Sequence, residues 1–322
     1  MSAPALARTR SDWPLYGAVL AAGAALDAAC RFFPAQLPPW MPWEFSWPVY
    51  LATVLSLVWF AKGWTRVAPP QRPSLWRAAS FVAGILSFYI VLQTHIDYWA
   101  QHMFFVHRAA HFVLHHAGAF LIALGASGPV LRAGMPAALH PILDAKPLRR
   151  TVDVLQHPAV APILFVGLLY FWLLPAIHTR VMLDANLYAL MNWTMAINGV
   201  MFWSLVLDPR PKPPARLSHL MRGAMILVIE LPQMVLGAIL SLSTADFYPV
   251  YEICGRILPM TALNDQHYGG LIIWLPGTLT SFAAMIVVLV TMRLNEEEAE
   301  RRGAAEPTTP STGSRHGDII IG

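Results

Sequence analysis

Five histidines lie within one short stretch of the chain, between two long apolar runs. The stretch reads HMFFVHRAAHFVLHH at residues 102–116, and its histidines are His102, His107, His111, His115 and His116. Three of them, His107, His111 and His115, follow one another at four-residue spacing. On an α-helix this spacing places side chains on one face, about 6 Å apart along the axis. The pattern predicts a metal or proton site; the alternative is a polar face hydrogen-bonded inside a bundle.

Two imidazoles at this spacing can ligate one metal ion, and a third ligand must come from elsewhere. Imidazole suits zinc, copper, iron and nickel, and the thioether of Met103 favours Cu(I). The carboxylates of Asp97 and Asp265 could complete a harder site or fix the imidazole tautomers. The candidate metal ligands are His107, His111, His115, His102, Met103, Asp97, Asp265 and His267. The residues alone leave zinc, copper, iron and nickel open as the metal.

A second polar cluster is LNDQHYGG at residues 263–270. Asp265 and Gln266 precede an apolar run, where a carboxylate can cap the first turn of a helix. Gly269 and Gly270 would let a neighbouring helix approach closely. We expect Asp265 or His267 to lie against the histidine-rich helix, with the capping role as the alternative.

The composition determines which elements must position these residues. Of the 322 residues, 56% are hydrophobic and only 12% are charged, compared with about 25% charged in soluble domains. The chain is therefore expected to be an integral membrane protein. No basic stripe with interleaved aromatic residues is present, which excludes a nucleic-acid partner. Cys30 and Cys254 form no CxxC pair, and they could join in a disulfide if their side of the membrane is periplasmic.

Eight apolar segments are long enough, or nearly so, to cross a bilayer as helices. They are residues 14–33, 47–64, 76–94, 104–125, 158–177, 187–207, 220–243 and 268–292. The predicted fold is an all-α, polytopic transmembrane helix bundle of about eight spans. A cytoplasmic segment at 1–13 precedes the membrane domain at 14–293, and a disordered cytoplasmic tail is expected at 294–322.

Basic residues alternate from loop to loop. They gather between the second and third, the fourth and fifth, and the sixth and seventh spans, while the intervening loops carry almost none. By the positive-inside rule both termini then face the cytoplasm. The histidines and acidic residues consequently gather at the outer face of the membrane.

Several stretches in order resemble a known family. They are Asp97 followed by VHRAAHFVLHHAGAFLIALG, then HPAVAPILFVGLLYFWLLPAIH, GVMFWSLVLDPRP, LPQMVLGAILSLSTADFYPVY and LNDQHYGGLIIWLPG. The pattern is similar to that of the CtaG-like membrane proteins required for assembly of cytochrome c oxidase in bacteria. On this resemblance the family positions are filled by Asp97, His107, His111, Asp265 and Gln266, and the span at 14–33 is additional.

The chain also departs from the family pattern. Family members often carry histidines near the start of the sixth span, where this chain has Tyr188 and Asn192, and a histidine directly after the position of Trp172. If those histidines help to bind copper, the site in this chain must differ. His102, His115, His178 or His267 could then compensate.

The resemblance implies a non-enzymatic assembly factor in the bacterial cytoplasmic (inner) membrane, handling or delivering copper at the periplasmic face. Its expected partners are cytochrome c oxidase subunits, copper chaperones and the lipid bilayer. The alternative is a membrane-embedded zinc hydrolase that uses His107, His111 and Asp265, with water in the open metal position. A haem protein is a third hypothesis, but it lacks a second axial histidine at matching depth.

Overall fold

Long apolar runs form helices in a membrane because a helix satisfies every backbone polar group within its own segment. The computed structural model describes residues 12–305, and within that range it contains helices and no strand. The α-helices are α1 (Trp13–Phe32), α2 (Trp47–Arg66), α3 (Leu75–Gln93), α4 (His95–His102), α5 (Phe104–Phe112), α6 (Gly118–Leu124), α7 (Gly128–Gly134), α8 (His140–Leu143), α9 (Lys146–Leu155), α10 (Val160–Leu173), α11 (Pro175–Met182), α12 (Ala185–Val206), α13 (His219–Leu242), α14 (Val250–Cys254) and α15 (Ala262–Ala305). A π-helical turn, η3 (Val113–Ala117), joins α5 to α6. The short 3-10 turns are η1 (Pro34–Gln36), η2 (Pro69–Gln71) and η4 (Ala137–Leu139).

Each of the eight predicted apolar segments coincides with a long helix or a helical run. Among the described residues, five helices are long and apolar enough to cross a membrane by themselves: α1, α3, α12, α13 and α15. The number rises to seven if each of two bent pairs counts as one span. One pair is the α5–α6 run with α7, bent by 78°, and the other is α9 with α10, bent by 76°. The predicted all-α, polytopic membrane bundle is confirmed.

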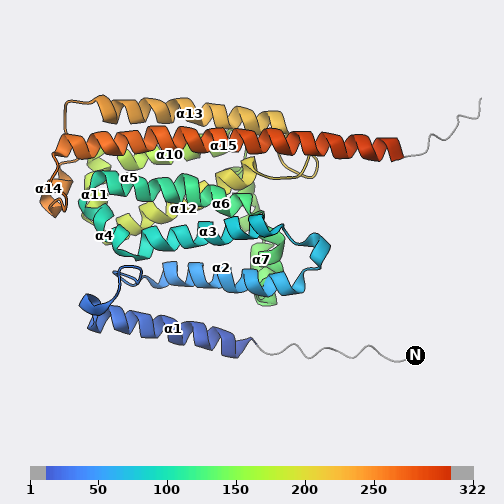
Figure 1. Cartoon of the computed structure of the whole chain (residues 1–322), viewed down its shortest axis with the longest axis horizontal. Coiled ribbons are helices and arrows are strands. Elements are labelled where there is room, and N and C mark those ends of the chain that lie inside the picture. Colours follow the sequence, from blue (N-terminus) through green and yellow to red (C-terminus); the bar gives the residue numbers. More distant parts are fainter. Residues whose placement is uncertain (1–11, 306–322) are drawn as a thin grey trace, which may run out of the picture.

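The fifth predicted span is shorter than expected. It was placed at 158–177, but α10 ends at Leu173 and a new helix, α11, begins at Pro175. Proline has no backbone N–H and disfavours the helical conformation for the residue before it, and Leu174 accordingly leaves the helix with ψ of 122°. The break places α11 beside α4 and α14 at one end of the bundle (Figure 1).

The long helices run side by side, and short elements close the two ends (Figure 1). Helix α15 packs along α13 on one edge of the bundle, and α1 lies on the opposite edge against α2. Helices α4, α11 and α14 lie at one end, which we call the α14 end. Helix α7 lies at the other, the α7 end. The histidine-rich α5 packs against α15 and α4.

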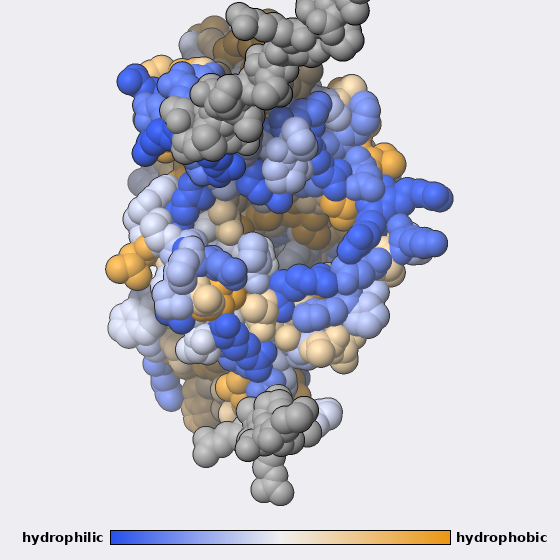
Figure 2. Space-filling model, turned by 90° about the vertical axis from the view of Figure 1, so that its right-hand side faces the viewer, coloured by the Kyte–Doolittle hydropathy of each residue, from blue (hydrophilic) through white to orange (hydrophobic). Residues whose placement is uncertain are grey.

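Hydrophilic residues gather at the α7 end, which Figure 2 shows face on. Asp144 binds Arg132 and Arg149 there, at 2.5 and 2.6 Å. The two guanidinium groups, Arg132 first, lower the pKa of the Asp144 carboxyl to about 2. Arg66 donates to the carbonyl oxygen of Ala133, and Arg216 pairs with Asp153. These contacts bring the three loops predicted to be basic together at this end of the bundle.

One prediction about the ends of the chain is partly corrected. Helix α15 continues to Ala305 through residues that were expected to be tail. The reason is local: Arg293–Glu297, Glu297–Arg301 and Glu298–Arg302 form ion pairs four residues apart, which favour helix. Residues 1–11 and 306–322 lie outside the described range.

Cys30 and Cys254 are both free, so the alternative of a disulfide is not realised.

Candidate metal-binding site

Helix α5 begins where a carboxylate from another helix caps it. The two carboxylate oxygens of Asp265, at the start of α15, accept the backbone N–H groups of Phe104 and Phe105 at 3.0 and 2.8 Å. The first N–H groups of a helix have no partner within it, so such a cap is stabilising. Arg256 pairs with the same carboxylate at 3.3 Å. Asp265 is completely buried in this position.

This contact settles how the fourth and eighth predicted spans meet. They do lie against each other, and Gly269 makes the approach close: a Cβ atom there would lie 2.4 Å from the ring of Phe104. The close approach predicted for Gly269 and Gly270 is confirmed. The carboxylate of Asp265, however, binds backbone N–H groups and Arg256 and no imidazole. Gln266 also has a structural contact, because its side-chain oxygen accepts the N–H of Phe247 at 2.7 Å.

His107 and His111 form a close pair inside the bundle. Their Nε2 atoms are 3.1 Å apart, and His111 Nε2 lies 2.9 Å from Oδ1 of Asn192 on α12. Both rings are buried, with exposures of 0% and 3%. The four-residue spacing therefore brings one nitrogen of each ring to the same point.

A tyrosine and a further histidine orient the pair through the Nδ1 side of the His107 ring. The hydroxyl of Tyr251 lies 3.0 Å from His107 Nδ1 and 3.0 Å from His178 Nε2. His178 Nδ1 lies 3.0 Å from the carbonyl oxygen of Trp172. Burial lowers the pKa of His178 to about 3, so this ring is neutral at physiological pH.

These contacts fix the positions of the protons. A carbonyl oxygen can only accept, so Nδ1 of His178 carries the proton and its Nε2 accepts the Tyr251 hydroxyl. The oxygen of Tyr251 is then free to accept from Nδ1–H of His107. The Nε2 lone pair of His107 is left facing His111. In this arrangement Nε2–H of His111 donates to Oδ1 of Asn192, and His111 presents its own lone pair once the amide of Asn192 turns. A neutral imidazole with its lone pair presented in this way is the form that binds metal.

A cavity of about 560 Å³ leads from the α14 end toward this pair, and we call it the vestibule. Three carboxylates line it, from Glu44, Asp97 and Asp184, together with Tyr188 and Asn192. Asn192 is also the residue that contacts His111. The vestibule therefore ends one side chain away from the histidine pair.

Asp97 is held at the side of the vestibule by two hydrogen bonds. It accepts the hydroxyl of Tyr188 at 2.9 Å and the amide of Gln101 at 3.0 Å. Burial raises the pKa of Asp97 to about 6, although both hydrogen bonds act to lower it. Its carboxylate therefore loses charge close to physiological pH.

The other predicted ligands bind elsewhere. His102 Nδ1 contacts the carbonyl of Tyr98 at 2.9 Å, His267 Nε2 contacts that of Ser243 at 2.8 Å, and His115 Nε2 contacts Asn198 at 3.1 Å. Met103 is fully buried where α4 meets α5. Within residues 12–305, no three His, Cys, Asp or Glu side chains are grouped so as to hold a metal ion. What the structure brings together is a pair.

Sequence reasoning missed several residues of this site. Neither Tyr251 nor Met182 was among the predicted site residues. The sulfur of Met182 lies 3.8 Å from the Tyr251 hydroxyl, and Met182 also lines the vestibule. His178 and Asn192 were noted only through the departure from the family pattern. That departure was the one available signal, because it marked positions at which this chain has residues other than the family's histidines.

Comparison with known proteins decides the family. The model of the cytochrome c oxidase caa3 assembly factors, CtaG, matches residues 56–294. The chain belongs to this family. The match includes α5, η3, α12 and all of the histidine pair's neighbours, and it leaves out α1, the helix predicted to be additional. No curated protein and no solved structure matches this CtaG-family chain.

Membership in the CtaG family supports a part in the assembly of cytochrome c oxidase and a general interaction with that oxidase. It also favours a role other than catalysis. The zinc-hydrolase alternative gains no support, because its third ligand, Asp265, is engaged in capping α5 and pairing with Arg256.

Proposed function

We propose that this CtaG-family protein holds Cu(I) at His107 and His111 and passes it on during assembly of a bacterial cytochrome c oxidase. Copper in this account is cargo, taken up and released. The proposal depends on one observation above all, the distance of 3.1 Å between the two Nε2 atoms. Two imidazole nitrogens bound at about 2.0–2.1 Å to one tetrahedral metal ion lie about 3.3 Å apart. The pair is therefore close to the required spacing before any metal arrives.

The surroundings of the pair suit a soft, singly charged metal ion. Imidazole and thioether are donors that Cu(I) accepts readily, and the sulfur of Met182 lies on the vestibule side of Tyr251. Tyr251 fixes the ring of His107, in the way that hydrogen bonds behind metal-bound imidazoles usually do. Within residues 12–305 no third His, Cys, Asp or Glu completes a site at the pair, so the thioether of Met182 is the further soft donor that we assign to Cu(I).

The vestibule supplies a path for the cargo. Glu44, Asp97 and Asp184 place negative charge around its walls, which attracts cations and raises their local concentration. The basic loops lie at the opposite, α7 end. By the positive-inside rule the α7 end would face the cytoplasm and the vestibule would open to the periplasm. Oxidase subunits would receive copper there.

Complementation in cells tests this proposal. A strain lacking the gene is supplied with the wild-type chain, His107→Ala/His111→Ala, or the control His267→Ala, and membrane oxidase activity and protein level are measured. We expect the double variant to accumulate but to leave the oxidase inactive, with partial recovery on added copper, and His267→Ala to support normal activity. Normal oxidase activity with the double variant would refute the proposal.

A further inference from the structure

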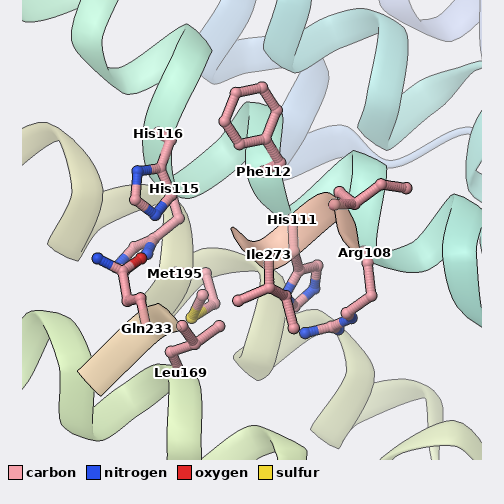
Figure 3. Close-up of a pocket in the computed structure, with 10 residues that line it drawn as sticks. Arg108, His111, Phe112, His115, His116, Leu169, Met195, Gln233 and Ile273 are labelled. Atoms are coloured by element: carbon pink, nitrogen blue, oxygen red, sulfur yellow. The ribbon is translucent and has the colours of Figure 1, made fainter. Parts of the chain in front are cut away.

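A second, smaller cavity lies deeper in the bundle than the vestibule. Its volume is about 20 Å³, slightly more than one enclosed water molecule needs. Arg108, His111, His115, His116 and Gln233 supply its polar walls, and Met195, Leu169 and Ile273 are among its apolar ones (Figure 3). We call it the Arg108 cavity.

Arg108 is buried without a partner. Its side chain is 2% exposed, and neither Nε nor Nη2 has a hydrogen-bond acceptor. No carboxylate in the described part of the chain pairs with it, and the nearby Asp265 is engaged by Arg256 and the start of α5. The ring of Phe104, 5.4 Å from the guanidinium carbon, is a weak substitute for an anion. A guanidinium does not deprotonate in proteins, so the charge remains.

Arg222 shows how this chain treats a buried arginine that needs no ligand. It is 1% exposed, and although its Nε has no acceptor, its Nη1 and Nη2 atoms donate to the backbone oxygens of Asp208, Arg210 and Leu217. Arg108 has no such set of acceptors. An unpaired buried charge is strongly unfavourable and is normally paired or made part of a functional site.

Other polar atoms in the wall of the Arg108 cavity also lack hydrogen-bond partners. His111 Nδ1, His115 Nδ1, His116 Nδ1 and Gln233 Oε1 all lack a partner. His111 and His115 each bind an asparagine through Nε2, to Asn192 and Asn198. An asparagine amide can donate or accept by rotating, so each histidine can turn either a lone pair or an N–H toward the cavity. The wall can therefore supply further donors around the guanidinium.

We propose that the Arg108 cavity binds a single small inorganic anion, of which chloride is the abundant example. The positive charge of Arg108 opposes a cation at this position, and an anion would compensate it with charge-assisted hydrogen bonds. The volume admits one monatomic ion but no larger phosphate or carboxylic acid. The bound anion would also offset the repulsion between Arg108 and a metal ion at His111, the residue that the cavity shares with the histidine pair. The inference does not depend on copper, because it applies to the metal-free protein.

Chloride binding to metal-free, detergent-purified protein tests the inference. Equilibrium dialysis with radioactive chloride is carried out on the wild-type chain, Arg108→Gln and the control Arg293→Gln, which removes an exposed arginine of α15. We expect one saturable chloride per chain for the wild type and the control, and none for Arg108→Gln. Absence of saturable binding in the wild type would mean that water alone fills the cavity, and would overturn the inference. So would unchanged binding in Arg108→Gln.

A second measurement covers a failure of Arg108→Gln to fold. Crystals of the wild-type chain soaked in bromide should show an anomalous peak beside the Arg108 guanidinium, between His111 and His115. Bromide peaks confined to the surface would contradict the inference. Either result is independent of copper binding, so failure of the copper proposal and failure of this one can be told apart.

Discussion

One helical run carries two histidine pairs with opposite surroundings. His107 and His111 point their Nε2 atoms at each other and lie at the end of a vestibule lined by carboxylates. His115 and His116 lie one turn further on, beside the small Arg108 cavity and its unpaired guanidinium. The ring of His115 stacks on Phe165 at 3.8 Å between centroids. The same residue type on the same helix is therefore suited to a cation in one place and, we infer, to an anion in the other.

The π-helical turn carries the second pair, whereas the first pair lies on the regular helix α5. Residues 113–117 follow the wider π geometry, so the regular four-residue face ends at His111 and both His115 and His116 turn inward. Single π turns of this kind are frequent at functional sites. Helix α12 supports the turn closely, because a Cβ atom at Gly199 would lie 2.7 Å from the backbone oxygen of His115. The first pair is held instead by α15, through Asp265 and Gly269.

The largest expected effect comes from removing the cap that holds the first pair. Asp265→Ala leaves Arg256 and two backbone N–H groups without their buried carboxylate, which costs about 3–5 kcal/mol. Thermal unfolding in detergent, followed by circular dichroism, should show a large fall in the unfolding midpoint. The control is Asp184→Ala, which removes an exposed cap of α12 and should cost about 1 kcal/mol. Equal effects of the two substitutions would mean that the Asp265 contacts add nothing beyond an ordinary cap.

Gly269→Ala should loosen the first pair by pushing α15 away from α5. The added Cβ would lie 2.4 Å from the ring of Phe104, and overpacking of this kind costs about 1–3 kcal/mol. Gly277→Ala is the matched control in the same helix, where nothing lies within 4 Å of the added atom. We expect a lowered unfolding midpoint for Gly269→Ala and an unchanged or raised one for Gly277→Ala. A neutral Gly269→Ala would show that the two helices are not tightly packed.

Tyr251→Phe should weaken the first pair and leave the second unaffected. The hydroxyl that orients His107 is lost, and such partners behind a metal ligand are worth about tenfold or more in affinity. Cu(I) affinity, measured by competition with a colorimetric chelator, should fall by about tenfold. Chloride binding should not change, since Tyr251 does not line the Arg108 cavity. A loss of both Cu(I) binding and chloride binding would point to general misfolding.

The smallest expected effect is a pH dependence from Asp97. Its pKa of about 6 lies above the ordinary value of 3.8, so its carboxylate is charged above pH 6 and neutral below. The rate of copper uptake should fall severalfold as the pH drops through 6. The Asp97→Asn variant should take up copper slowly at every pH. The same raised pKa makes the folded state less stable as the pH rises from about 4 to 6, because the charged form is the one that burial disfavours. A wild-type uptake rate independent of pH would exclude Asp97 from the entry path.

The sequence was sufficient to predict the apolar helical segments and the convergence of the first histidine pair. Apolar length predicts spans, and the four-residue spacing of His107 and His111 predicts that their rings converge. The sequence was insufficient to predict the contacts of His115. A π turn changes the helix face on which this residue lies, and the spacing of the residues does not predict such a turn. Tyr251, His178 and Met182 come from short elements whose positions depend on the break at Pro175 and the packing of α14. Asp265 was expected to lie beside the histidines. Its carboxylate instead accepts hydrogen bonds from the free N–H groups at the start of α5, and these bonds determine its position.

X-ray absorption at the copper edge is the most direct test of the central claim, that the first pair and not the second holds the metal. The Cu(I)-loaded wild-type chain is compared with His107→Ala/His111→Ala and with His115→Ala/His116→Ala. We predict imidazole-bound copper in the wild type and in the His115→Ala/His116→Ala variant, and none retained in His107→Ala/His111→Ala. Copper retained with unchanged imidazole coordination in His107→Ala/His111→Ala would contradict the account.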